Sequence, residues 1–128
     1  MDIAIVDDHH IVRKGLIEIL HNLGNFNIVI EAQNGSEFIE KYKRAQHLPE
    51  ICIIDIQMPE MNGFELVEYI AKNFPELKRL ILTTYNEEYY LFKMIKLGVN
   101  GYLLKDCHPG ELKLALESIS ENSFYFNN

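Results

Sequence analysis

The sequence has no tryptophan, only two cysteines and no long uninterrupted apolar run. A helix that crosses a bilayer needs about 20 consecutive apolar residues, so we expect no transmembrane segment and no membrane contact. The amino terminus also lacks the basic and then apolar pattern of a secretion signal, since Asp2, Asp7 and Asp8 are acidic. Because Cys52 lies inside an apolar run, a disulfide framework is not expected, and the cysteine content favours a reducing cytoplasm.

Positive charge is scarce as well, because 12 Lys and Arg stand against 19 Asp and Glu, for a formal net charge of −7. Binding to nucleic acid requires clustered Lys and Arg side chains that contact phosphates. We therefore expect that the chain binds DNA only through a carboxyl-terminal domain that is absent from this sequence. The length predicts one domain, with residues 1–120 as the folded unit and residues 121–128 as a tail or the start of a linker.

What the sequence does contain is a regular alternation of short apolar runs and amphipathic segments. The run from Ile51 to Ile54 is apolar throughout, which is typical of a strand buried on both faces of a parallel sheet. We predict strands at residues 2–6, 26–32, 51–54, 79–84 and 101–104, and helices at residues 9–23, 37–45, 64–74, 86–97 and 109–119. Ser36 can cap the second helix, and Asn62 and Gly63 form a turn before the third. The apolar face of the first helix is expected to comprise Val12, Leu16, Ile19, Leu20 and Leu23. Five strands alternating with five helices predict a doubly wound, flavodoxin-like α/β fold with a five-stranded parallel sheet in the order 2-1-3-4-5.

Four of the five predicted strands end in a polar group, and the carboxyl ends of parallel strands meet at one edge of a sheet, where ligands bind. The first strand ends at Asp7 and Asp8, the third at Asp55, the fourth at Thr83 and the fifth at Lys105. We therefore predict one pocket that holds three carboxylates, a hydroxyl and an amine. The alternative is that Asp55 caps its loop and that Asp7 and Asp8 cap the first helix.

Three neighbouring carboxylates repel one another, and a hard divalent cation such as Mg²⁺ relieves that repulsion while leaving room for phosphate oxygens. Asp55 can then act as a nucleophile that forms an acyl phosphate. Lys105 and the metal ion would stabilise charge on the phosphoryl oxygens, and Thr83 would donate a hydrogen bond to one of them. His9 is adjacent to the acids, but without a Cys or His at zinc-ligand spacing we interpret it as a loop or capping residue rather than a zinc ligand.

The segments VDDHHIVRKGL, DIQMPEMNGFEL and TTYN…GVNGYLLKD resemble the CheY-like receiver domain of two-component response regulators, and the resemblance spans essentially the whole chain. Thr83 follows Asp55 by 28 residues (83 − 55) and Lys105 follows it by 50 (105 − 55), as in that family. The resemblance implies that Asp55 is the phosphoacceptor and that Thr83 and Tyr102 form a switch pair. It further implies a Mg²⁺ or Mn²⁺ ion held by four groups, namely the carboxylates of Asp7, Asp8 and Asp55 and the backbone carbonyl of Gln57.

The motifs are most similar to the NarL/FixJ subfamily, whose members carry LuxR-type helix-turn-helix domains, although His10 stands where that subfamily often has proline. The resemblance implies a histidine kinase as phosphoryl donor, transcriptional control, and a homodimer formed through the fourth helix, fifth strand and fifth helix. A protein of this kind assists its own modification and is not an enzyme. Two alternatives stay open: a stand-alone receiver that acts in a phosphorelay or by protein contact, and a Mg²⁺-dependent phosphatase, which usually has an acid where this chain has Gln57.

Two further expectations concern the surroundings of the site. Gln57 and Thr84 flank the acceptor and hydroxyl positions, and we expect them to limit the access of water to the phosphoryl group. The fourth helix and its approach are rich in aromatic residues, of which some should face solvent as part of a partner surface: Tyr85, Tyr89, Tyr90 and Phe92. The aromatic tail from Phe124 to Phe126 is expected either to dock on the body or to begin a linker.

Overall fold

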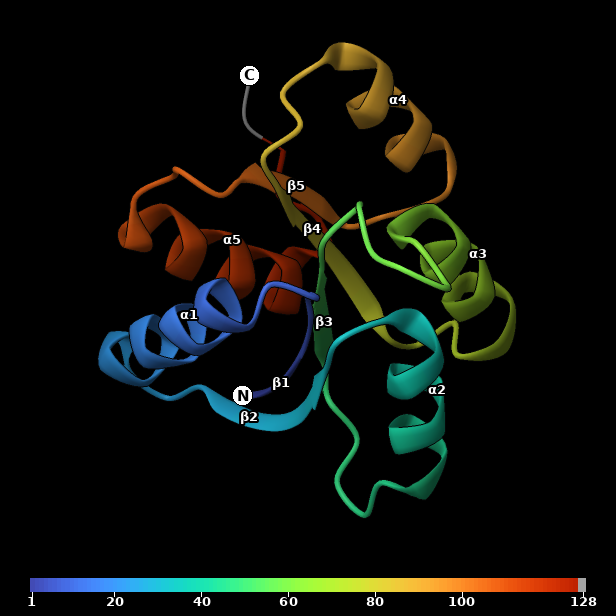
Figure 1. Ribbon diagram of the computed structural model, residues 1–128. Helices are drawn as coiled ribbons and strands as arrows, with labels where there is room; N and C mark the ends of the chain where they lie inside the picture. Colours follow the sequence, from blue (N-terminus) through green and yellow to red (C-terminus); the bar gives the residue numbers. More distant parts are fainter. Residues whose placement is uncertain (127–128) are drawn as a thin grey trace.

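The computed structural model describes residues 1–126, so the last two positions of the predicted tail lie outside the described residues. Five parallel strands form one sheet in the order β2-β1-β3-β4-β5, and the predicted fold class and strand order are confirmed (Figure 1). The elements along the chain are β1 (Asp2–Val6), α1 (His10–Leu23), β2 (Asn27–Ala32), α2 (Gly35–Arg44), β3 (Ile51–Ile54), α3 (Gly63–Asn73), β4 (Lys78–Thr83), α4 (Glu88–Lys96), β5 (Gly101–Leu104) and α5 (Pro109–Asn122).

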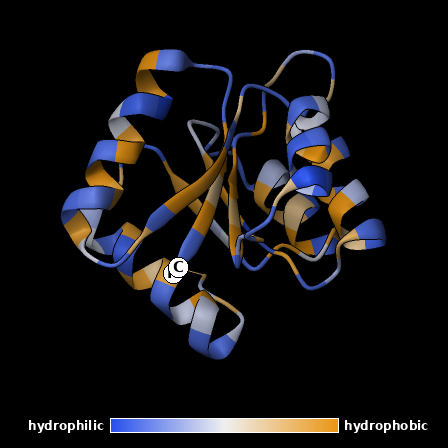
Figure 2. Ribbon diagram, turned by 90° about the horizontal axis from the view of Figure 1, so that it is seen from below, coloured by the Kyte–Doolittle hydropathy of each residue, from blue (hydrophilic) through white to orange (hydrophobic). Residues whose placement is uncertain are grey.

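Helices cover both faces of the sheet, with α1 and α5 on one side and α2, α3 and α4 on the other (Figure 1). Alternate residues of each central strand enter two separate cores, so that Ile3 and Ile5 pack with α1 and α5 while Ala4 and Val6 pack with the opposite helices. Apolar residues gather on the strands and on the helix faces turned toward them (Figure 2). Burial on both faces is the reason that these strands read as continuous apolar runs.

The register of the sheet places the polar residues that follow the strands beside one another. Val6 pairs with Ile54, so the next residue of each strand, Asp7 and Asp55, lies at the same edge. Thr83 of β4 pairs with Leu104 of β5, the outermost strand, so the next residue, Lys105, lies at the same edge. The functional edge therefore follows from strand length and parallel pairing.

Helix starts and faces differ from the predictions in two places. The side chain of Asn34, not Ser36, caps α2 by accepting a hydrogen bond from the amide of Glu37, because the helix begins one residue earlier than Ser36. In α1, Val12 and Ile19 were predicted among the apolar face but are exposed, whereas Arg13 is buried beside Leu16 and Leu20. An arginine can occupy an inward position when its guanidinium is hydrogen-bonded, and Arg13 meets that condition.

The carboxyl-terminal tail docks on the edge of the sheet, and α5 runs two residues past the predicted end of the folded unit at residue 120. Tyr125 forms a parallel bridge with Gly101, donates its amide to the carbonyl of Asn100 at 2.9 Å and its hydroxyl to Glu111 at 3.1 Å. A Cβ at Gly101 would lie 3.0 Å from the carbonyl oxygen of Tyr125, so glycine permits this close approach. Within the described residues, none of the helices has the length and apolar character needed to cross a bilayer.

Candidate functional site

The site is built around two buried carboxylates that share one ammonium group. Asp7 and Asp55 are only 3% and 5% exposed. The Nζ of Lys105 lies 2.8 Å from Asp7 Oδ2 and 3.1 Å from Asp55 Oδ2. Buried charges persist only when they are paired and hydrogen-bonded, and this arrangement satisfies both acids with a single cation. The sheet edge thus brings together three of the residues predicted to form the pocket.

Asp7 is held from several directions. Its backbone carbonyl accepts a hydrogen bond from Arg13 Nη1 at 2.6 Å, and its Oδ1 accepts one from the amide of His9 at 2.9 Å. Arg13 is itself fixed by Glu31, whose Oε1 lies 2.7 Å from its Nε. The guanidinium of Arg13 lowers the pKa of Glu31 through this hydrogen bond, with burial opposing it and Lys14 assisting. A charged, hydrogen-bonded network therefore fixes the loop that carries the first acid.

Asp55 is held against the start of α3. Its Oδ1 accepts a hydrogen bond from the amide of Ile56 at 2.8 Å, which leaves Oδ2 to face Lys105. Gly63 closes the loop beneath it, because a Cβ there would lie 2.5 Å from the carbonyl oxygen of Asp55. The loop can fold back so tightly only with glycine at this position. α3 then begins with a full capping box formed by Asn62 and Glu65.

The pKa values of Asp55 and Lys105 are set by burial and by the charges and hydrogen bonds between these residues and Asp7. Burial raises the pKa of Asp55 above its ordinary value, with the charge of Asp7 adding to this, and Lys105 only partly opposes the shift. Burial alone would lower the pKa of Lys105, but its hydrogen bond to Asp7 and the charge of Asp55 together raise it. Lys105 is therefore a cation at neutral pH, and its charge faces both carboxylates.

Asp8 and His9 complete a cluster of donors. One ligand atom from each of Asp7, Asp8, His9 and Asp55 can be chosen so that all four lie within 4.8 Å of one another. Asp8 Oδ1 is buried yet accepts no hydrogen bond, which is a costly state for a carboxylate oxygen and one that a bound cation relieves. Oxygen donors from three carboxylates suit Mg²⁺ or Mn²⁺. These residues thus fit a divalent cation.

Thr83 and Tyr102 do not contact each other through a hydrogen bond but meet at the same loop. Thr83 is fully buried, and its Oγ1 accepts a hydrogen bond from the amide of Tyr85 at 3.2 Å. The hydroxyl of Tyr102 donates to the carbonyl of Tyr85 at 2.7 Å. Burial, with a smaller contribution from Glu87, raises the pKa of Tyr102 to about 12. Tyr85 therefore connects the two residues of the predicted switch pair.

Gln57 and Thr84, the residues expected to control water access, occupy different positions. The side chain of Gln57 accepts a hydrogen bond from the hydroxyl of Tyr85. Thr84 is exposed and lines a small hollow with Asn86 and Lys105. Gln57 thus has an aromatic partner, Tyr85, which was not among the residues predicted to limit water access.

Sequence reasoning missed Arg13, His9, Gly63 and Tyr85 as parts of the site. A signal existed for Arg13, which is spaced three and seven residues from the buried Leu16 and Leu20 and so shares their helix face. Gly63 was interpreted only as a turn residue, and its close approach to Asp55 depends on the folded loop. Tyr85 contacts residues distant in sequence, and His9 lies in the loop after β1. The periodicity of apolar residues predicts neither arrangement.

Comparisons with known proteins agree with this geometry. The profile of the response regulator receiver domain matches residues 3–117. The oxygen regulatory protein NreC of Staphylococcus epidermidis (strain ATCC 12228 / FDA PCI 1200) is 37% identical over 126 residues, which are 98% of this chain and 57% of that protein. The transcriptional regulatory protein DegU of Brevibacillus brevis is 31% identical over 130 residues, covering 99% of this chain and 53% of that protein. The chain thus spans a little more than half the length of these relatives.

Solved structures give the same result. The isolated REC domain of RcsB from Salmonella enterica serovar Typhimurium, determined with the phosphomimetic BeF3⁻, matches with a TM-score of 0.90 at 27% identity, covering 100% of this chain and 94% of that one. The signal receiver domain of the putative response regulator NarL from Mycobacterium tuberculosis matches with a TM-score of 0.86 at 26% identity, over 94% and 96% of the two chains. This chain belongs to the response regulator receiver domain family, with relatives of the NarL/LuxR type.

Proposed function

We propose that this receiver accepts a phosphoryl group on Asp55 from the phosphohistidine of a histidine kinase. The observation that carries this proposal is the shared contact of Lys105 with Asp7 and Asp55 at the carboxyl edge of the sheet. Asp55 Oδ2 attacks phosphorus, a new O–P bond forms, and the P–N bond to the kinase imidazole breaks, with a proton going to the leaving nitrogen. Lys105, already beside Oδ2, contacts the charged phosphoryl oxygens as they arrive.

The divalent cation belongs to the same proposal. Asp7, Asp8 and Asp55 would hold it, together with the backbone carbonyl of Gln57 that the family resemblance implies. The ion, Mg²⁺ or Mn²⁺, would neutralise charge on the phosphoryl group during transfer. Arg13 and the amide of His9 keep the Asp7 carboxylate in position for this task. Asp55 itself must be ionised to attack; Lys105 opposes the burial that raises its pKa, and a bound cation would oppose it further.

The output is a change on the face formed by α4, β5 and α5. A phosphoryl group on Asp55 would draw the hydroxyl of Thr83 away from the amide of Tyr85, and Tyr102 would follow because it donates to the same residue. Beside Tyr102 lies a groove of about 570 Å³ whose lining includes Leu91, Phe92 and Ile95 of α4. We infer that this face forms the homodimer contact and that phosphorylation shifts its population between two arrangements.

Gln57 and Tyr85 would set the lifetime of the acyl phosphate by limiting the approach of water. Their side chains are joined by a hydrogen bond that spans from the loop after β3 to the loop after β4. We expect Gln57→Ala, and to a smaller extent Thr84→Ala, to change the rate of dephosphorylation several-fold, with Lys72→Ala on the exposed side of α3 as the control. The measurement is the rate at which the phosphoryl group is lost after the donor is removed. A Gln57→Ala variant that loses it at the wild-type rate would contradict this idea.

The wider context is also a proposal. NreC and DegU are named as regulatory proteins, DegU as a transcriptional one, and the matched parts are 57% and 53% of their lengths. One RcsB structure contains dimers bound to DNA. We infer a cytoplasmic transcription regulator in which a separate domain contacts DNA, and which assists its own phosphorylation without turning over another substrate. Gln57, in place of a second acid, disfavours the phosphatase alternative.

Intact-mass measurement tests the proposal. Incubation with Mg²⁺ and a small acyl phosphate should add one phosphoryl group to the wild type and none to Asp55→Asn. Asp106→Asn is the matched control, because Asp106 adjoins Lys105 in sequence but is exposed and outside the acid cluster. Labelling that persists in Asp55→Asn, or that is lost equally in Asp106→Asn, would overturn the assignment.

A further inference from the structure

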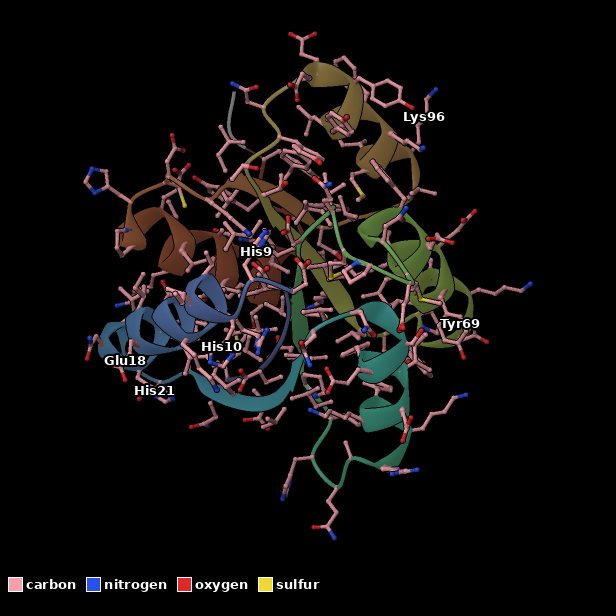
Figure 3. All side chains as sticks on the ribbon, viewed as in Figure 1. His9, His10, Glu18, His21, Tyr69 and Lys96 are labelled. Carbon is pink, nitrogen blue, oxygen red and sulfur yellow. The ribbon has the colours of Figure 1, made fainter. Side chains whose placement is uncertain are left out.

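The imidazole of His9 lies among the three acids of the site. Its Nδ1 is 3.1 Å from Asp7 Oδ1, 3.3 Å from Asp8 Oδ1 and 3.7 Å from Asp55 Oδ2. Figure 3 shows His9 near the centre of the molecule, where the loop after β1 approaches the middle of the sheet, while His10 lies lower beside α1. His10 instead contacts Arg13, with 3.1 Å between its Nδ1 and Nη2. Two adjacent histidines thus have different surroundings.

Helix capping and packing do not account for the position of the His9 ring. His9 is the N-cap residue of α1, but its side chain makes no capping hydrogen bond. The ring is also 58% exposed, so it is not held inside the acid cluster by burial in a core. The amide of His9 already donates to Asp7 Oδ1, and the ring nitrogen faces the same oxygen. What fixes the ring is its proximity to carboxylate oxygens.

The spacing of these atoms suits a single metal ion. Ligand bonds of about 2.1 Å place two donors on opposite sides of an ion about 4.2 Å apart. All three distances from His9 Nδ1 to the carboxylate oxygens lie within that span. The two oxygens of Asp7 also face different partners, since Oδ2 contacts Lys105 and Oδ1 faces His9. The nitrogen and the ammonium therefore do not compete for the same oxygen of Asp7.

We propose that His9 supplies a nitrogen ligand to the divalent ion at this site and thereby determines which ion the receiver prefers. This inference rests on the metal site in the proposed function. Imidazole nitrogen favours Zn²⁺, Co²⁺ and Ni²⁺, whereas Mg²⁺ prefers oxygen ligands and retains water. A site with one nitrogen and three carboxylates binds the first group more tightly than an all-oxygen site does. Mg²⁺ binding depends on the oxygen ligands and not on the His9 nitrogen.

Metal affinity of the unphosphorylated chain tests this proposal with His9→Ala and His9→Gln. Zn²⁺ is titrated in competition with a chromophoric chelator, and Mg²⁺ by calorimetry. Both variants should lose at least about tenfold in Zn²⁺ affinity, the lower range found when groups around a metal site are removed, and less than twofold in Mg²⁺ affinity. His10→Ala should change neither affinity, and circular dichroism verifies that each variant is folded.

A direct readout comes from ¹¹³Cd²⁺ bound to chain labelled with ¹⁵N-histidine. Coordination by His9 gives a scalar coupling between the cadmium and one ring nitrogen, which His9→Gln removes and His10→Ala retains. Absence of that coupling, unchanged Zn²⁺ affinity, or equal losses for Zn²⁺ and Mg²⁺ would each overturn the role of His9. Failure of the wild type to bind Mg²⁺ at all, with Asp55→Asn behaving identically, would instead overturn the metal site in the proposed function.

Discussion

The two helices that flank β5 are attached to the sheet in very different ways. α5 buries four residues against the core, namely Leu112, Ala115, Leu116 and Ile119, whereas α4 buries only Met94. On α4, Tyr89 is 64% exposed and Phe92 is 55% exposed. α4 also projects away from the rest of the body at the top of Figure 1. A helix with little buried apolar area belongs to the least stable part of a fold, which is the part that a switch can rearrange.

Apart from the buried Met94, the contacts of α4 run sideways, to α3 and to the loop before α4. Tyr90 stacks near Phe64 of α3 with 6.1 Å between ring centroids, and Lys93 lies over the same Phe64 ring at 4.3 Å. Tyr90 also packs on Tyr85, with 4.6 Å between ring centroids. Each such contact is worth about 0.5–1.5 kcal/mol, much less than a buried aliphatic side chain. The position of α4 thus depends on Tyr85, which is the residue bonded to both Thr83 and Tyr102.

Truncation of a buried residue on α5, compared with truncation of exposed apolar residues on α5 and α4, should show this difference most strongly. Leu116 is fully buried, so Leu116→Ala should lower the free energy of unfolding by about 2–5 kcal/mol. Leu114→Ala on the exposed side of α5, and Ile95→Ala on α4, should each stay within about 0.5 kcal/mol of wild type. Urea unfolding measures all three. An Ile95 variant as unstable as the Leu116 variant would contradict the description of α4 as weakly attached.

Lys105 lies in the segment that joins β5 to the firmly packed α5. Its substitution should cause the next largest loss of stability. Lys105→Met leaves Asp7 and Asp55 buried and facing each other without a cation. Removing one partner of a buried ion pair costs about 3–5 kcal/mol, and the partial exposure of Lys105 reduces this to about 2 kcal/mol. Added Mg²⁺ should restore much of the loss, measured as the thermal midpoint with and without the ion. Lys113→Met, on the same stretch of chain but away from the acids, is the control.

Much of this molecule could be predicted from its sequence because its strands are buried on both faces. Continuous apolar runs ending in Asp7, Asp55 and Lys105 define the strands and their shared edge together, since parallel pairing leaves little freedom in register. Helix ends were less predictable, as with Asn34 and Ser36, because both residue types cap helices and only the local backbone decides between them.

The remaining features depend on contacts between distant residues. Arg13 is buried because Glu31 and the backbone carbonyl of Asp7 accept hydrogen bonds from its guanidinium. Both partners lie outside α1, so the helical pattern of that segment does not predict them. Tyr85 was predicted as part of an aromatic partner surface, and the exposure of Tyr89 and Phe92 confirms only that some of these rings face solvent. Its hydrogen bond to Gln57 requires two loops to meet, which sequence patterns do not encode. Docking of the tail through Tyr125 was one of two open alternatives.

The smallest predicted effect concerns Tyr102, the link between the anchored and the weakly attached helices. Tyr102→Phe removes the hydrogen bond to the carbonyl of Tyr85 and should cost about 1 kcal/mol at neutral pH. Hydrogen exchange should then rise in α4 and stay unchanged in α5. Leu103→Ala is a poor control because it opens the core, so Tyr89→Phe, an exposed tyrosine on α4 itself, serves instead.

The same hydroxyl gives a pH dependence of known sign. The folded pKa of Tyr102 is raised to about 12, above its value of about 10 in an unfolded chain. The folded protein therefore holds this proton at higher pH than the unfolded chain does, and unfolding releases it between these values. The advantage of wild type over Tyr102→Phe should be complete below about pH 10 and diminish as pH rises toward 12. Burial raises the pKa of Tyr42, Tyr85 and Tyr125 as well, so ultraviolet titration should find one fewer late-ionising tyrosine in the variant than in the wild type. Equal titration curves would mean that β5 and the loop into α4 are not joined through this hydroxyl.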